Sequence, residues 1–200
     1  NHYETLGRFF CMKTIVLFHS VCGNTYLLAR FYADTLAALG AEVRLYRLPD
    51  GRYEQLAPLF EASQTYQAAI SNIPILEQTA LLTEADMLFL GSPTYFGNVS
   101  AAVKTFMDSC CDLWPAAQLS GKKFGCFASA STYQGGGILC LQAMNTFAQH
   151  MGMQLLSVPA NIKGGPQPAY GILHAAGGLS LNRPAADMQT AIRDYLTRLL

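Results

Sequence analysis

Hydrophobic residues follow two patterns along this chain: short continuous apolar runs, and longer segments with helical spacing. The first run covers residues 14–18, and its apolar and β-branched side chains are typical of a strand buried on both faces of a parallel sheet. The same reasoning predicts further strands at residues 42–46, 87–90, 123–128 and 153–158. Five strands are therefore expected.

Helices are predicted between these strands. Leu28, Phe31 and Leu36 recur at helical spacing until Gly40, a residue that often follows a helix. Further helices are expected at residues 100–108, capped by Asn98 or Ser100, and at 137–151 and 184–200. The connection at residues 49–86 is expected to hold one or two helices. The Gly/Pro-rich segment 164–178 is expected to be a long ordered loop or, alternatively, a flexible surface flap.

This alternation of strands and helices indicates the fold class. Parallel βαβ units with right-handed crossovers place helices on both faces of one open sheet. We therefore predict an α/β fold with a doubly wound, five-stranded parallel sheet. Residues 12–200 are expected to form a single domain. Residues 1–11 lack periodicity and precede Met12, so they are expected to be an N-terminal extension or an expression remnant.

Composition excludes several classes of protein. Of the 200 residues, 51% are hydrophobic and only 13% are charged, enough to build a large core. Thirteen basic and thirteen acidic residues give no net charge, which argues against nucleic-acid binding. Without a signal peptide or a run of about 18 apolar residues, a cytoplasmic protein with no membrane insertion is expected. The six cysteines lack metal-binding spacing, so no metal site is predicted.

Candidate chemistry lies after the first, third and fourth predicted strands, because ligands of open parallel sheets bind at the carboxyl ends of the strands. Residues 20–25 (Ser-Val-Cys-Gly-Asn-Thr) lead into a helix and offer neutral donors to a phosphate. They contain no Lys or Arg, and neither an ATP-binding nor a dinucleotide-binding glycine motif. The alternative is a turn that only caps the helix.

The other two loops extend this picture. Tyr95 and Phe96 lie in a turn between glycines and are suited to stack on a planar ring, or else to pack the loop down. Residues 129–137 end in a glycine run that lets a ligand approach the backbone, or that makes a flexible loop. Together the three loops predict a pocket for a phosphate, a polyol chain and a flat aromatic system.

Several of these segments resemble a known family. Residues 20–25 resemble the flavodoxin phosphate loop. Residues 91–108, with Leu113-Trp114, are similar to the Pro-Thr-Arg-Phe-Gly-Asn-Met-Ser and Leu-Trp segments of the WrbA-type NAD(P)H:quinone oxidoreductases. Residues 164–171 and 176–178 are similar to that family's Gly-Gly-Thr-Pro-Tyr-Gly and Ala-Gly-Gly motifs. The resemblance runs from about Met12 to the last residue and implies a flavodoxin-like sheet with strand order 2-1-3-4-5.

The resemblance also implies a non-covalent FMN cofactor and a set of residues around it. The phosphate would be surrounded by Ser20, Val21, Cys22, Gly23, Asn24 and Thr25. The isoalloxazine would lie along Pro93, Thr94, Tyr95, Phe96 and Gly97, with Ser129, Ala130, Ser131, Thr132, Tyr133, Gly135 and Gly136 on its far side. His150, or alternatively Met151, would lie beside the flavin, and Trp114 and Tyr95 would lie on the substrate side.

The implied activity is two-electron transfer from NADH or NADPH through FMN to a quinone, in a homo-oligomer that is a dimer or a tetramer. The flavin would carry the chemistry, so no catalytic side chain is predicted. Tyr95 stands where the family has Arg, and Cys22 where it has Tyr, which leaves nicotinamide recognition and quinone preference open. The alternatives are a flavodoxin-type electron carrier, which the zero net charge disfavours, and a flavin-free scaffold.

Overall fold

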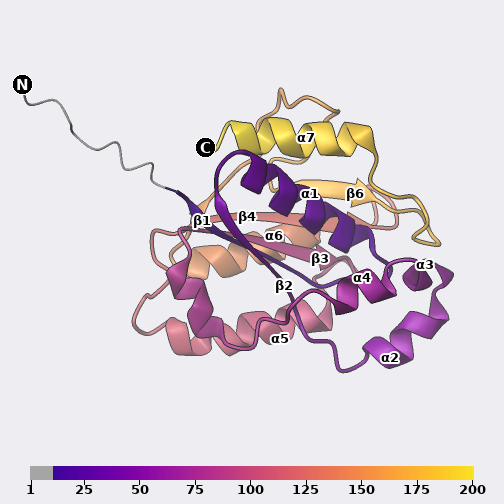
Figure 1. Cartoon of the computed structure of the whole chain (residues 1–200), viewed down its shortest axis with the longest axis horizontal. Coiled ribbons are helices and arrows are strands. Elements are labelled where there is room, and N and C mark those ends of the chain that lie inside the picture. The colour runs from indigo at the N-terminus through magenta and orange to yellow at the C-terminus, as the bar shows by residue number, and fades with distance from the viewer. Residues whose placement is uncertain (1–10) are drawn as a thin grey trace, which may run out of the picture.

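The central feature of the computed structural model is a parallel sheet with strand order β2-β1-β3-β4-β5, in which β6 also pairs with β4 (Figure 1). The structure describes residues 11–200, so all of the predicted extension except Cys11 lies outside the described residues. The strands are β1 (Lys13–Phe18), β2 (Glu42–Arg47), β3 (Met87–Pro93), β4 (Lys123–Ala130), β5 (Gln154–Leu155) and β6 (Ile172–Ala175). The predicted doubly wound α/β class is confirmed.

Helices cover both faces of this sheet, α1 and α7 on one and α5 and α6 on the other (Figure 1). Their bounds are α1 (Asn24–Ala38), α5 (Ala101–Ser109), α6 (Gly137–His150) and α7 (Ala186–Thr197). Ser100 is the residue that caps α5, because its Oγ accepts a hydrogen bond from the Val103 N–H at 3.4 Å. The helices therefore match the predicted segments closely.

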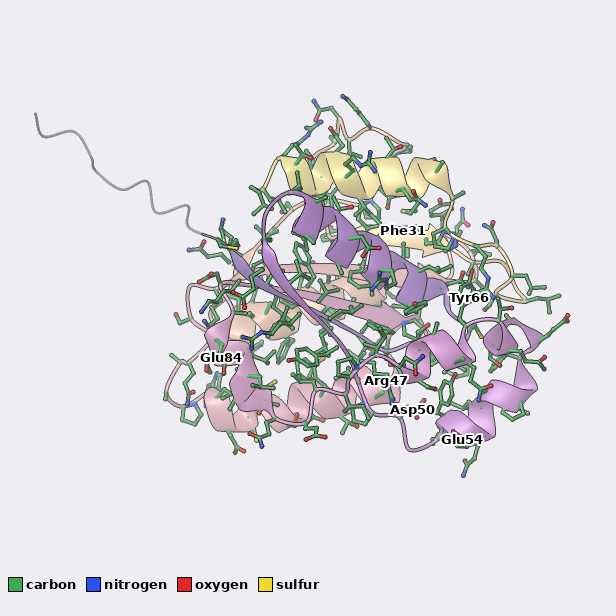
Figure 2. The ribbon with its side chains drawn as sticks, in the orientation of Figure 1. Phe31, Arg47, Asp50, Glu54, Tyr66 and Glu84 are labelled. Carbon is green, nitrogen blue, oxygen red and sulfur yellow. The ribbon has the colours of Figure 1, made fainter. Side chains whose placement is uncertain are left out.

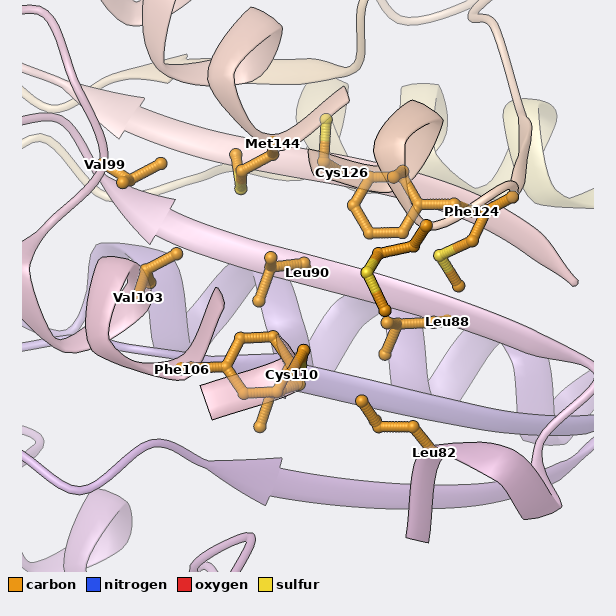
Figure 3. Close-up of a cluster of buried hydrophobic side chains, with 14 of the residues drawn as sticks. Leu82, Leu88, Leu90, Val99, Val103, Phe106, Cys110, Phe124, Cys126 and Met144 are labelled. Carbon is orange, nitrogen blue, oxygen red and sulfur yellow. The ribbon is translucent and has the colours of Figure 1, made fainter. Parts of the chain in front are cut away.

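The core is divided between the two faces by the alternation of side chains along each strand. In β1, Val16 and Phe18 pack against α1 and α7, whereas Ile15 and Leu17 pack on the face that α5 and α6 cover. Figure 3 shows this second cluster, with labelled side chains that include Leu88 and Leu90 of β3 and Phe106 of α5. Burial on both faces explains why the strands read as continuous apolar runs.

The fifth position of the sheet differs from the prediction. The strand expected at residues 153–158 is limited to Gln154–Leu155, which pairs with the start of β4. The end of β4 is paired by Ile172–Ala175, a strand inside the segment that was expected to be a loop. Gly171 makes this pairing possible, because a Cβ there would lie 2.4 Å from the Cys126 carbonyl oxygen.

The connection between β2 and β3 also differs from the one or two helices expected. It holds several short helical segments, which are α2 (Tyr53–Leu56), η1 (Ala57–Leu59), α3 (Glu61–Gln64), α4 (Gln67–Ser71) and η2 (Thr79–Glu84). Pro58 lies in the first turn of η1 and Pro74 comes three residues after α4, and each limits how far a helix can extend through it. The segments α2, η1, α3 and α4 lie beside the carboxyl edge of the sheet (Figure 1), whereas η2 lies at the opposite edge, where β3 begins.

Candidate functional site

A cavity of about 240 Å³ opens at the carboxyl edge of the sheet, where the three candidate loops meet. The first loop lines it with Ser20, Val21, Cys22, Asn24 and Thr25. The second contributes Pro93, Thr94 and Tyr95, and the third Ser129, Ala130 and Ser131. The parallel sheet thus brings together three segments that lie far apart in the sequence.

The start of α1 is arranged to receive an anion. No side chain caps its N-terminus, and its first turn contains no acidic residue, so the free N–H groups and the positive end of the helix dipole are available. Ser20 Oγ accepts a hydrogen bond from the Gly23 N–H at 3.1 Å, which fixes the turn before the helix. Thr25 Oγ1 and Ser129 Oγ lie 2.8 Å apart and link the first loop to the third.

The rest of the cavity is lined by uncharged residues, some of them apolar and others with polar atoms that face no partner in the described part of the chain. Thr94 Oγ1 and Asn24 Oδ1 are buried without a hydrogen-bond partner among the described residues, while Asn24 donates through Nδ2 to the Ser180 carbonyl at 2.8 Å. Burial raises the pKa of the Cys22 thiol and raises the pKa of Tyr95 to about 12, so both groups are neutral near pH 7. An anionic phosphate and a polyol chain fit this donor set.

Some predicted residues support the cavity or surround it instead of lining it. A Cβ on Gly136 would lie 2.5 Å from the Cα of Gly97, so these two glycines allow the third loop to pack on the second. Phe96 is fully exposed and the Tyr133 side chain is also exposed. The residues of the three predicted loops that do not line the cavity are Gly23, Phe96, Gly97, Thr132, Tyr133, Gly135 and Gly136.

Trp114 and His150 lie together, but far from the cavity. Trp114 Nε1 donates to the His150 carbonyl at 3.1 Å, and His150 is the last residue of α6. Because α6 begins just after the third loop and is about 21 Å long, its last residue lies at the opposite edge of the sheet. Met151, the alternative to His150, directly follows it. Within one chain, none of these residues reaches the cavity.

Four lining residues were missed by the sequence reasoning: Phe60, Ala176, Gly178 and Ser180. Ala176 and Gly178 belong to the Ala-Gly-Gly motif, so the resemblance contained a signal for them. No feature of the sequence indicated Phe60, because it comes from the insertion between β2 and β3. His174 fixes the segment behind these residues, since its Nε2 donates to the Asn182 carbonyl at 2.7 Å, and burial lowers its pKa, which favours a neutral ring.

A second polar pocket lies beside the cavity and shares Ser20 with it. The buried His19 donates through Nε2 to Asp50 Oδ2 at 2.9 Å. This hydrogen bond holds the pKa of the Asp50 carboxyl below its usual value, against the opposing effect of burial. Figure 2 labels Asp50 with Arg47 and Glu54 near α2. His19 therefore has a structural partner at Nε2, whereas its Nδ1 is buried without a hydrogen-bond partner among the described residues.

The lowered pKa of Asp50 predicts a pH dependence of stability. The ionised carboxylate stabilises the fold above the unfolded-state pKa of about 4, and this contribution is lost as the pH falls through the lower folded-state value. We expect the Tm of Asp50→Asn to lie below that of the wild type at pH 6, and the difference to shrink toward pH 2. Asp34→Asn, which removes an exposed carboxylate, is the control. A Tm difference that is constant with pH would contradict this expectation.

The fold, with a polar cavity at the carboxyl ends of its central strands, places the protein among the flavodoxin-like α/β proteins. Residues 12–164 match the profile of the NADPH-dependent FMN reductase family, and the chain belongs to this family. No helix in the described part of the chain is long and apolar enough to cross a membrane.

Relatives and solved structures agree with this assignment. The chain is 31% identical over 183 residues to an NAD(P)H dehydrogenase (quinone) of Aromatoleum aromaticum, covering 87% of each chain. It is also 31% identical to a protein of the same name from Geobacter metallireducens, covering 87% of this chain and 89% of that one. A WrbA-like flavodoxin structure from Agrobacterium tumefaciens superposes with a TM-score of 0.64 at 22% identity, covering 93% and 94% of the two chains.

Proposed function

We propose that this protein is an FMN-dependent NAD(P)H:quinone oxidoreductase that passes two electrons from NADH or NADPH to a quinone. The observation that carries the proposal is the neutral, donor-rich cavity at the uncapped start of α1. Membership of the FMN reductase family and the flavodoxin-like fold make FMN the cofactor. Relatives named NAD(P)H dehydrogenase (quinone), aligned over most of both chains, support the choice of substrates.

The residues of the cavity would divide the binding of FMN among them. Ser20 and the free N–H groups at the start of α1 would hold the phosphate. The unpartnered Thr94 Oγ1 and Asn24 Oδ1 would bind the hydroxyls of the ribityl chain. Tyr95, which is partly exposed at the cavity, would contact the ring system with a neutral hydroxyl.

Bound FMN supplies the two-electron redox chemistry, so the reaction requires no side-chain nucleophile. The chain's own contribution is to orient its ligands and to limit the access of water. The Thr25–Ser129 link holds the first and third loops in one arrangement before any ligand binds. Tyr95 keeps its proton near pH 7, and it therefore offers a donor without adding a charge next to the ring.

The test is an anaerobic one. The purified protein is loaded with FMN, NADH or NADPH is added, and the visible absorption of the flavin is followed with time. We expect rapid bleaching with at least one nucleotide and recovery of the absorption when a benzoquinone is added. This result would also identify the donor.

Two other outcomes would point elsewhere. A bound flavin that neither nucleotide reduces would contradict the proposal and favour a flavodoxin-type electron carrier. Failure to bind FMN at all would favour a scaffold without flavin. The zero net charge provides little electrostatic steering toward a charged protein partner, which is why we place the carrier second.

We also propose that the protein is a homo-oligomer in which Trp114 serves the cavity of another copy. Trp114 is 60% exposed at the edge of the sheet opposite its own cavity, so only a second subunit can bring it to a flavin. Phe96, Tyr133 and Leu139 are exposed apolar residues of the second and third loops and the start of α6, and such a surface is suited to subunit contact.

Subunit complementation tests this arrangement. We expect Trp114→Ala to reduce quinone turnover while FMN stays bound. Refolding it together with Gly136→Val, which keeps Trp114 but is expected to bind FMN poorly, should restore turnover in the mixed oligomers. Wild-type protein refolded with Gly136→Val is the control for the exchange of subunits. Mixed oligomers without restored activity would show that Trp114 does not act on a neighbouring copy.

A further inference from the structure

Arg183 connects three distant parts of the chain at the back of the first loop. It follows β6, and its guanidinium donates through Nη1 to the Cys22 carbonyl and through Nη2 to the Ala62 carbonyl, the second at 2.8 Å. Its Cζ lies 4.9 Å from the centroid of the Tyr66 ring. Within residues 11–200, no carboxylate forms an ion pair with Arg183. Its positive charge is therefore not neutralised by a neighbouring acid.

Tyr66 lies between Arg183 and the first loop and contacts both. A Cβ on Gly23 would lie 2.5 Å from Tyr66 Cδ2, so the ring packs directly against the Gly23 backbone. Figure 2 labels Tyr66 near the start of α1. Neither Arg183 nor Tyr66 lines the cavity. The two side chains form a cationic and aromatic support that touches the loop without touching the space where a ligand binds.

The Cys22–Gly23 peptide transmits this support to the cavity. Its carbonyl accepts from Arg183, and its N–H donates to Ser20 Oγ at 3.1 Å. A charged donor on a carbonyl polarises the peptide and strengthens its N–H as a donor, and each bond in such a chain strengthens the next. Since Ser20 Oγ acts as an acceptor here, its own O–H is available to donate into the cavity.

We propose that Arg183 is a positioning residue that makes the first loop selective for a phosphate monoester. The first loop contains no Lys or Arg, and the structure supplies the missing cation from a segment about 160 residues further along the chain. The cation acts through the Cys22–Gly23 peptide and Ser20. Applied to the proposed function, on which this inference rests, Arg183 determines the preference for FMN over riboflavin, which lacks the phosphate.

The test compares the two flavins. The dissociation constants of FMN and riboflavin are measured by fluorescence titration for the wild type and for Arg183→Gln. Because the charge of Arg183 acts on the phosphate through the first loop and not on the ring system, we expect FMN binding to weaken about tenfold, with riboflavin binding changed less than about twofold. Arg193→Gln removes an exposed charge on α7 and should leave both constants unchanged.

A second readout is the pH dependence of the preference. The wild-type ratio of FMN to riboflavin affinity should rise between pH 5 and 7, because the phosphate loses its second proton near pH 6. This rise should be smaller in Arg183→Gln. Arg183→Lys keeps the charge but loses the paired donors of the guanidinium, so its FMN preference should be intermediate. It also provides the test if the glutamine variant does not fold.

Three results would overturn the inference. Equal weakening of both flavins would make Arg183 a general structural residue. Unchanged FMN binding in both Arg183 variants would remove its role, while the proposed function would stand because the wild type still binds FMN. A wild type that does not bind FMN would refute the proposed function together with this inference, and measuring the wild type first separates the two cases.

Discussion

Gly136→Val is expected to lower FMN affinity by about 100-fold and to reduce thermal stability. Gly136 has a φ of 83°, a conformation that a β-branched residue adopts only with strain. A Cβ there would also lie 2.5 Å from the Cα of Gly97, and backbone atoms cannot move aside as a side-chain tip can. Strain and overlap together cost about 2–4 kcal/mol, which the third loop can relieve only by separating from the second.

A matched control separates the strain from the overlap. Gly121 has a φ of 77°, but a Cβ there would meet no atom within 4 Å. Gly121→Val should therefore carry the conformational penalty alone and leave FMN affinity unchanged. Thermal unfolding and FMN titration of both variants are the measurements. Equal losses of affinity would mean that the contact between the loops does not shape the cavity.

The strands and helices were predictable wherever a long apolar pattern filled the core. The runs that became β1, β3 and β4 have both faces buried, so their composition is dictated by packing alone. Ile172–Ala175 could not be identified in this way, because four residues between glycine- and proline-rich segments give no periodicity. Its pairing with β4 depends on the close approach that Gly171 allows, which is a tertiary contact.

The site was predictable to the extent that it is local. The first loop could be predicted as a phosphate site because its small polar residues, the turn and the start of the helix are consecutive in the sequence. Arg183 and Phe60 could not be identified from the sequence, because only the folded chain brings them to that loop. Trp114 shows the converse limit, because it stands in a segment that resembles the family's Leu-Trp motif while the fold places its side chain against the His150 carbonyl, far from the cavity.

Phe127→Ala is expected to remove a large part of the stability beneath the cavity. Phe127 is fully buried in β4, and its ring stacks on Tyr32 of α1 with the centroids 4.7 Å apart. It also lies in the space that a side chain on Gly91 of β3 would occupy. Truncating such a ring costs about 3–5 kcal/mol, out of a typical total of about 5–15 kcal/mol. The Tm of the apoprotein should fall accordingly.

FMN should offset part of this loss, because a ligand that binds only the folded state contributes about 2.7 kcal/mol at a hundredfold excess over its dissociation constant. Phe127 and Ser129 point to the same face of β4, and Ser129 contacts Thr25 at the start of α1. The position of α1 against β4 therefore affects both the packing of Phe127 and the shape of the cavity. Phe31→Ala, which truncates a half-buried ring of α1 at the margin of the same cluster, is the control and should cost less. Thermal unfolding with and without FMN measures both effects. Equal Tm losses in the two variants would show that the stacked rings do not hold α1 against the sheet.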